Sequence, residues 1–328
     1  MRSVKLYLYR LPMDSGVILR DEKLSERVGY VVRLSDGHRS GLGEIAPLPG
    51  FSPESLDDVY QPLISACQHW QQTGEMLTQD LPASAAFGLS MAELELEGAI
   101  PEQGNYQVAP LCTGDPDELL PALNQIEGDK VAKVKVGLYE PIRDGMLVNL
   151  FLESMGDLKL RLDANRAWTL ERALKFAQYI PPSMRRRISF IEEPCHSPSD
   201  SLTFAIETGI AIAWDETLQE AVRGPDFRLE DLTGAKSIVI KPTLIGSVNR
   251  CIELIDKAQS LGIRPVLSSS LESSLGLTQI ARLAQWKTPQ VTPGLDTIGL
   301  FQRQLEVAWP GCELAMDSIE QQSLIWQG

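Results

Sequence analysis

The sequence predicts an α/β protein: a modified (β/α)8 TIM-type barrel of the (β/α)7β form, with an N-terminal α+β capping domain. Three observations predict this class. Short apolar segments that each end in a charged residue recur along residues 99–310, their charges lie 23 to 29 residues apart, and helical segments separate them. Such a spacing corresponds to roughly one strand plus one crossover helix.

Five of these segments are predicted as β-strands because apolar and β-branched residues fill them. Each carries Lys, Asp or Glu near its carboxyl end, where a parallel barrel gathers the residues that perform chemistry. The segments are Val131–Gly137, Lys159–Asn165, Ile188–Pro194, Ile210–Glu216 and Ser237–Pro242. We therefore expect one active site built from the charges of consecutive strands.

The same spacing identifies three further strands, which brings the predicted total to eight. One lies before the five, at Tyr106–Cys112, and two follow them, at Arg264–Ser270 and Val291–Thr297. Helical periodicity fills the intervening segments, such as 170–179 and 248–261. An open doubly wound sheet shows the same alternation, but it would spread the charges along a crevice and not around a ring.

Residues 1–98 follow a different pattern and predict the capping domain. Antiparallel strands joined by a hairpin turn at 35–38, and then two helices, are expected at Val4–Arg10, Gly29–Leu34, Arg39–Ile45, Ser55–Gln72 and Ala83–Leu96. The stretch Gly41–Phe51 is rich in glycine and proline and is a candidate lid loop. Residues 99–310 would form the barrel, and residues 311–328 a C-terminal segment that packs back on the cap.

Composition and charge exclude several classes of protein. The 328 residues include 44 acidic and 30 basic side chains, a net charge of −14, and no basic run, which argues against a nucleic-acid surface. No apolar run approaches the ~20 residues that span a bilayer, and the N-terminus lacks a signal-peptide layout, so we expect a cytoplasmic protein without a membrane partner. The five cysteines form no Cys-x-x-Cys pair, which predicts reduced thiols. None of the three histidines has a partner at metal-ligand spacing.

Three carboxylates fall at the ends of three consecutive predicted strands: Asp163, Glu192 and Asp215. An all-oxygen set of this kind suits a hard cation such as Mg²⁺ or Mn²⁺. Any one of these carboxylates alone would be interpreted as a solvated acid in a loop, but their matched positions at the strand ends favour a metal site. Glu193 and Glu216 directly follow two of them and, by strand alternation, should point the other way.

Lysines form the complementary half of the predicted site. Lys133 and Lys135 are two residues apart and therefore share a face of their strand, and Lys241 on the sixth strand would face Lys135 across the barrel. Mutual repulsion and a nearby cation would lower lysine pKa values and make a neutral amine available as a general base. The alternative is that these lysines form structural salt bridges.

Metal carboxylates beside lysines suit one class of reaction, the removal of a proton α to a carboxylate. The metal ion would hold the resulting enediolate, and a lysine on either face would determine where the proton goes.

At these residues the chain resembles the enolase superfamily, in its muconate-lactonising branch, whose pattern is K-x-K on the second strand, metal carboxylates on the third to fifth, and lysine on the sixth. Longer runs resemble the o-succinylbenzoate synthase family of menaquinone biosynthesis. They include GEIAPLPGFS (43–52), KVAKVKVGLYE (130–140), LRLDANRAW (160–168) and SSSLESSLGLTQ (268–279). A branch that uses a histidine-aspartate dyad is disfavoured because the histidine is missing.

The resemblance implies a hydro-lyase that catalyses the Mg²⁺-dependent syn dehydration of 2-succinyl-6-hydroxy-2,4-cyclohexadiene-1-carboxylate to 2-succinylbenzoate, with Mn²⁺ as an expected substitute metal. By that likeness Lys135 removes the α-proton and, as an ammonium, assists departure of the hydroxide from the same face. Lys241 would stay cationic on the opposite face. Lys133 would hydrogen-bond to the substrate carboxylate and lower the pKa of Lys135.

The expected partner is a small dicarboxylate substrate, and the oligomeric state is left open, with a monomer among the alternatives. Residues expected to contact the substrate come from the strand of Asp163, from the last two strands and from the cap: Arg161, Asn165, Ser268, Gly294, Arg20, Leu48 and Phe51. The serine hydroxyl and glycine N–H would bind the succinyl arm, and the cap residues would exclude water.

Two other functions remain open from the sequence. A muconate cycloisomerase or an N-acylamino-acid or dipeptide epimerase of the same superfamily would use the same lysines for proton transfer on opposite faces. A non-catalytic ligand binder on a degenerate barrel would have lost some of the charges, and here all are present.

Overall fold

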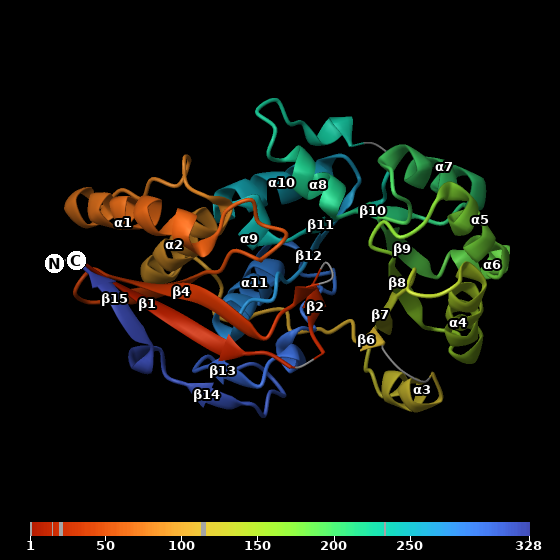
Figure 1. Cartoon of the computed structure of the whole chain (residues 1–328), viewed down its shortest axis with the longest axis horizontal. Helices are drawn as coiled ribbons and strands as arrows, with labels where there is room; N and C mark the ends of the chain where they lie inside the picture. The colour runs from red at the N-terminus through yellow and green to blue at the C-terminus, as the bar shows by residue number, and fades with distance from the viewer. Residues whose placement is uncertain (1, 15, 20–21, 113–115, 233) are drawn as a thin grey trace. The chain divides into compact units, whose positions relative to one another are not determined.

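The protein divides into two compact units in a computed structural model (Figure 1). The described residues are 2–14, 16–19, 22–112, 116–232 and 234–328. The first unit comprises Met1–Tyr106, Ile240–Asp256 and Leu267–Gly328, and the second Gln107–Val239 and Lys257–Val266. Arg20, which the sequence assigned to the substrate site, lies outside the described residues. No helix within these described ranges is long and apolar enough to cross a membrane.

A four-stranded antiparallel sheet organises the first unit, in the order β15-β1-β4-β5. Its strands are β1 (Ser3–Pro12), β4 (Glu26–Ser35), β5 (Ser40–Ile45) and β15 (Ser323–Gln327). The predicted strands and the hairpin turn between Ser35 and Ser40 are confirmed. The chain ends meet here, since Val4 and Gly328 exchange two backbone hydrogen bonds of 3.0 Å.

Two helices cover this sheet, α1 (Leu56–Thr73) and α2 (Ala83–Glu97), drawn in orange in Figure 1. Helix α1 begins with a reciprocal capping box between Ser55 and Asp58, which satisfies backbone N–H groups of its first turn. Helix α2 packs directly on β5, because a Cβ atom at Gly43 would lie only 1.9 Å from the Gly88 carbonyl oxygen. The prediction of a lid loop over Gly41–Phe51 is therefore wrong for its first part, where glycine serves close packing of a strand.

The rest of the first unit consists of helices that follow the last barrel strands and of short pairs of strands. These elements are β2 (Ile18–Leu19), β3 (Glu22–Lys23), α9 (Pro242–Ile245), α11 (Ser274–Lys287), β13 (Arg303–Leu305) and β14 (Ala315–Asp317), and α10 (Val248–Ser260) extends into the second unit.

A parallel sheet organises the second unit, in the order β12-β11-β10-β9-β8-β7-β6. Its strands are β6 (Leu111–Cys112), β7 (Val131–Lys135), β8 (Lys159–Asp163), β9 (Ile188–Glu192), β10 (Ile212–Trp214), β11 (Ser237–Ile240) and β12 (Arg264–Leu267). Each strand neighbours the next one in the chain, which confirms the predicted α/β barrel class as a curled half-barrel of seven strands.

Helices connect these strands: α3 (Pro116–Asn124), α4 (Pro141–Ser154), α5 (Leu170–Gln178), α6 (Pro182–Arg185), α7 (Pro198–Thr208) and α8 (Glu216–Ala221). In Figure 1, α4 to α7 lie along one side of β7–β9. Because every connection returns the chain to the same end of the sheet, the carboxyl ends of the strands share one edge.

The predicted eighth strand at Val291–Thr297 is wrong. Within the described residues this segment contributes only an isolated parallel bridge between Ser268 and Gly294. Pro293 cannot donate a ladder hydrogen bond, which prevents a continuous strand. Among the described residues the five cysteines form no disulfide bond.

Candidate active site

The charged residues of β7 to β10 meet at one edge of the second unit because of the strand register. Lys135 pairs with Asp163 across β7 and β8, and Asp163 pairs with Glu192 across β8 and β9. Asp215 lies two residues beyond Ala213, the partner of Glu192 on β10. Parallel pairing thus places the three carboxylates that the sequence assigned to a metal at the same edge of the sheet.

Lys133 is the cation at the centre of this edge. Its Nζ lies 2.9 Å from Asp163 Oδ2 and 3.1 Å from Glu192 Oε2. The lysine side chain is 26% exposed, and the two carboxylates are 9% and 6% exposed. Burial lowers the pKa of Lys133, but the negative charges of Asp163 and Glu192, with a smaller contribution from Asp215, outweigh it and raise that pKa well above its ordinary value. Lys133 is therefore held protonated.

The donor set fits a divalent cation, although the side chains are arranged around an ammonium. No three Asp, Glu, His or Cys side chains in the described part of the chain lie close enough to one another to bind an ion. Asp163 and Glu192 nevertheless converge on one positive charge, and the buried Asp215 is near enough to act on it. An ion bound by these oxygens would take the place of the Lys133 ammonium.

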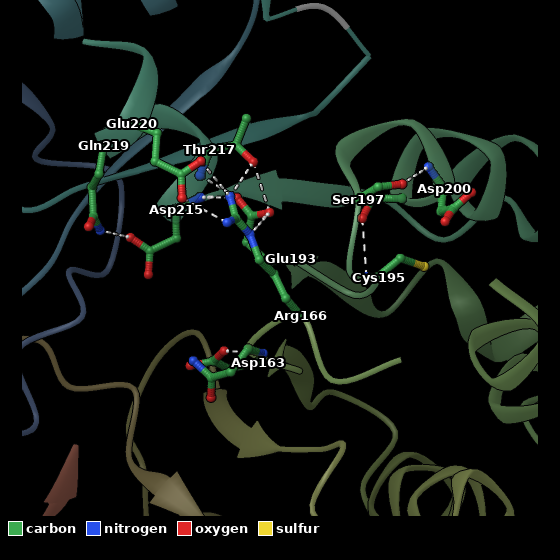
Figure 2. Close-up of polar contacts among 12 residues, drawn as sticks. Asp163, Arg166, Glu193, Cys195, Ser197, Asp200, Asp215, Thr217, Gln219 and Glu220 are labelled. Carbon is green, nitrogen blue, oxygen red and sulfur yellow. Dashed lines mark hydrogen bonds and ion pairs between the residues drawn. The ribbon is translucent and has the colours of Figure 1, made fainter. Parts of the chain in front are cut away.

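Two of the carboxylates are oriented by neighbouring groups (Figure 2). Gln219 Nε2 donates a hydrogen bond of 2.6 Å to Asp215 Oδ1, and the backbone N–H of Asn165 donates one of 3.2 Å to Asp163 Oδ1. Each hydrogen bond fixes the orientation of one carboxylate, which is how outer partners orient metal-binding side chains. Gln219 was not among the residues predicted from the sequence, although its place one helical turn after Asp215 was an available signal.

Glu193 has a larger role than strand alternation predicted. Its carboxylate is buried, and it accepts hydrogen bonds from the backbone N–H groups of Asp215 (3.0 Å) and Thr217 (2.9 Å) and from the Thr217 hydroxyl (3.0 Å). Arg166 forms an ion pair with it, with Nε 3.3 Å from Oε2. Burial raises the pKa of Glu193, although the Thr217 N–H and the Arg166 charge act in the opposite direction.

The turns that carry these groups have an unusual backbone. Asn165, Arg166 and Glu193 have positive φ angles of 46°, 58° and 40°, and among the described residues only Leu271 is a further example outside glycine. Each such residue costs on the order of 1–3 kcal/mol, and the conformation persists where surrounding contacts over-determine it. The strain follows directly after two of the three carboxylate-bearing strands.

Two other predicted residues of the second unit differ in their surroundings. Lys135 is exposed at the end of β7. Arg161 is only 6% exposed, and its guanidinium carbon lies 5.5 Å from the Phe190 ring centroid. Burial lowers the pKa of Arg161 to about 10.

The remaining predicted residues belong to the first unit. Lys241 directly precedes α9, and its Nζ lies 6.0 Å from the ring centroid of Phe51. Ser268 Oγ donates a hydrogen bond of 3.1 Å to the Gly294 carbonyl oxygen, so these two residues are in contact. Leu48 is 4% exposed within an apolar cluster, and its role as a closing lid residue stays a prediction.

Comparison with known proteins identifies the family. Residues 1–96 match the family described as "MenC, N-terminal domain", and residues 122–306 match "Enolase C-terminal domain-like". The o-succinylbenzoate synthase of Vibrio cholerae serotype O1 (strain M66-2) is 64% identical over 327 residues, which is 100% of this chain and 98% of that protein. This chain belongs to the o-succinylbenzoate synthase family. It is therefore an enzyme, a hydro-lyase that acts on a small molecule, as the sequence predicted.

Other members of the o-succinylbenzoate synthase family agree over the same length. The protein from Aliivibrio fischeri (strain MJ11) is 55% identical, with 100% of each chain covered. MenC of Desulfotalea psychrophila has a TM-score of 0.73 at 22% identity, covering 96% of this chain and 98% of that one. The o-succinylbenzoate synthase of Thermosynechococcus elongatus, solved with Mg in its active site, has a TM-score of 0.68 at 24% identity, covering 91% and 93%. This chain has the same fold as these two structures.

Proposed function

We propose that this enzyme dehydrates 2-succinyl-6-hydroxy-2,4-cyclohexadiene-1-carboxylate to 2-succinylbenzoate in menaquinone biosynthesis, with Mg²⁺ held by Asp163, Glu192 and Asp215. The observation that carries the proposal is the convergence of Asp163 and Glu192 on one positive charge at the carboxyl end of the sheet. Membership of the o-succinylbenzoate synthase family supplies the substrate. Mn²⁺ is the expected substitute because it prefers the same oxygen ligands.

When bound, the metal ion would attract the substrate carboxylate and stabilise the negative charge that develops as the α-proton leaves. Asn165 and Gln219 support the arrangement, because each already donates a hydrogen bond to one of the proposed ligands.

Lys135 is the proposed base. Its exposed position at the end of β7, in register with Asp163, is compatible with contact to a substrate that binds at that carboxylate. In its neutral form it removes the α-proton, and the ammonium so formed protonates the departing hydroxide on the same face. Lys133 would hydrogen-bond to the substrate carboxylate.

Lys241 is proposed to remain cationic and to stabilise the charge on the opposite face of the substrate. Ser268 is proposed to bind the succinyl carboxylate through its hydroxyl. Gly294 lies beside it, but its backbone N–H already donates a hydrogen bond of 2.8 Å to the Leu267 carbonyl oxygen. Phe51, beside Lys241, is proposed to exclude water from the reacting centre.

The test is an ultraviolet assay of the purified protein with the cyclohexadiene substrate, first with Mg²⁺ and then with excess chelator. Loss of the diene absorbance that stops on chelation and resumes on addition of Mg²⁺ is expected. A folded, Mg²⁺-saturated protein that leaves the substrate unchanged but racemises a chiral N-acylamino acid in deuterated water would replace the proposal by an epimerase.

A further inference from the structure

We infer that Glu193 is a positioning residue that fixes the three carboxylate-bearing turns relative to one another and thereby sets the affinity of the metal site. This inference rests on the proposed function, since it concerns the same site. Glu193 itself is not a ligand, because its carboxylate accepts hydrogen bonds from groups that belong to the neighbouring turns (Figure 2).

The side chain of Glu193 connects its own strand to β10. Oε1 accepts from the backbone N–H of Asp215 itself, at 3.0 Å, and from that of Thr217, at 2.9 Å. Oε2 accepts from the Thr217 hydroxyl at 3.0 Å. The Glu193 carboxylate therefore holds the backbone of Asp215, the third proposed ligand. Glu193 itself directly follows Glu192, the second proposed ligand.

The same residue connects its strand to the turn after β8. The Arg166 backbone N–H donates a hydrogen bond of 2.7 Å to the Glu193 carbonyl oxygen, and Arg166 Nε lies 3.3 Å from Glu193 Oε2. Arg166 is the third residue after Asp163, the first proposed ligand. One residue thus bonds to both turns that flank it, and Figure 2 shows Arg166, Glu193 and Thr217 as one cluster beside Asp215.

Alternative packing roles do not require this arrangement. A buried carboxylate that served only the core could accept hydrogen bonds from any donors. The donors to Glu193 are instead the backbone N–H of Asp215, which is a proposed ligand, and groups of Thr217 and Arg166, which lie two and three residues after proposed ligands. The positive φ angles at Asn165, Arg166 and Glu193 indicate that the turns are held in this geometry by their contacts.

The experiment is calorimetric titration of Mg²⁺ into the full-length wild type and into Glu193→Gln, with the metal-free fold of each checked by circular dichroism. The glutamine retains an oxygen for the backbone N–H groups, but it presents an amide N–H₂ or a neutral oxygen to Arg166. We expect the Kd for Mg²⁺ to rise by about tenfold or more, as for other outer-shell partners of metal ligands, and the Mg²⁺ concentration for half-maximal turnover to rise equally.

Glu220→Gln is the matched control. Glu220 binds the same Arg166 guanidinium, with Nη1 2.8 Å from Oε1, but its side chain is 58% exposed. We expect its Kd to stay within about twofold of the wild-type value, because an exposed ion pair contributes little.

Arg166→Met keeps the inference testable if Glu193→Gln does not fold. It removes the cation from Glu193 and leaves the backbone hydrogen bonds, so it should raise the Kd by a smaller factor than the loss of the carboxylate. An unchanged Kd in Glu193→Gln, or in Arg166→Met where only that variant folds, overturns the inference and leaves the proposed function intact. A wild type that binds no Mg²⁺ overturns the proposed metal centre, and this inference with it.

Discussion

Replacing Lys133 by methionine should destabilise the metal-free protein by about 3 kcal/mol. The ammonium lies 2.9 Å and 3.1 Å from two carboxylates. At an effective dielectric constant of about 20, each such contact corresponds to roughly 5 kcal/mol of Coulomb energy, most of which is offset by desolvation of the charges. Removing one partner of a buried ion pair costs about 3–5 kcal/mol, and the 26% exposure of Lys133 favours the lower end of that range.

Urea unfolding in the presence of a chelator measures this effect, with circular dichroism as the signal. Lys135→Met is the matched control, because Lys135 lies on the same strand, is exposed, and forms no ion pair with any described residue. Its free energy of unfolding should stay within about 0.5 kcal/mol of the wild-type value. Mg²⁺ should stabilise Lys133→Met more than it stabilises wild type, because it neutralises carboxylates that have lost their cation. A Lys133→Met protein as stable as the control would refute the pairing of Lys133 with Asp163 and Glu192.

Three further outcomes are expected. Lys135→Ala should lower kcat in the ultraviolet assay by about 10²–10⁴-fold with an unchanged circular dichroism spectrum, whereas an unfolded variant would make Lys135 structural. Two backbone N–H groups lower the pKa of Asp36 to about 2. The ionised carboxylate should therefore stabilise its turn at pH values above the ordinary aspartate pKa of about 4, and this stabilisation should be lost as the pH falls toward 2. A carboxyl NMR titration of Asp36 with its midpoint near 4 would contradict this. Gly43→Ala should destabilise the protein by about 1–3 kcal/mol or more, because the added Cβ would lie 1.9 Å from the Gly88 carbonyl oxygen. Gly299→Ala is the control, because a Cβ there would have no atom within 4 Å. Equal unfolding midpoints of the two variants would contradict the prediction.

The parallel sheet and its charged edge could be predicted because two simple periods coincide in the sequence. Apolar runs mark β7 to β11, and charges recur at the length of one strand plus one helix, so the register of Lys135, Asp163 and Glu192 follows. The resemblance to known motifs then supplied the reaction. Neither the strand register nor the reaction required knowledge of side-chain contacts.

What escaped prediction depends on local geometry that periodicity does not encode. Strand alternation places Glu193 away from Glu192, but a φ angle of 40° turns the chain there, and the carboxylate reaches the backbone of Asp215. Salt bridges of the lysines were only the alternative prediction, because the pairing of Lys133 with two carboxylates depends on distances across strands that a shared face does not determine. Glycines suggested a loop at Gly41–Phe51, yet the first ones allow a strand to approach a helix.

The most direct test of the account follows Mg²⁺ binding and dehydration together in wild type and Asp215→Asn. The wild type should bind Mg²⁺ and convert the cyclohexadiene substrate, and Asp215→Asn should lose metal affinity and turnover together by about 10²-fold or more while keeping its fold. An Asp215→Asn protein that binds Mg²⁺ as tightly as wild type and dehydrates the substrate at the same rate would contradict the proposed metal centre.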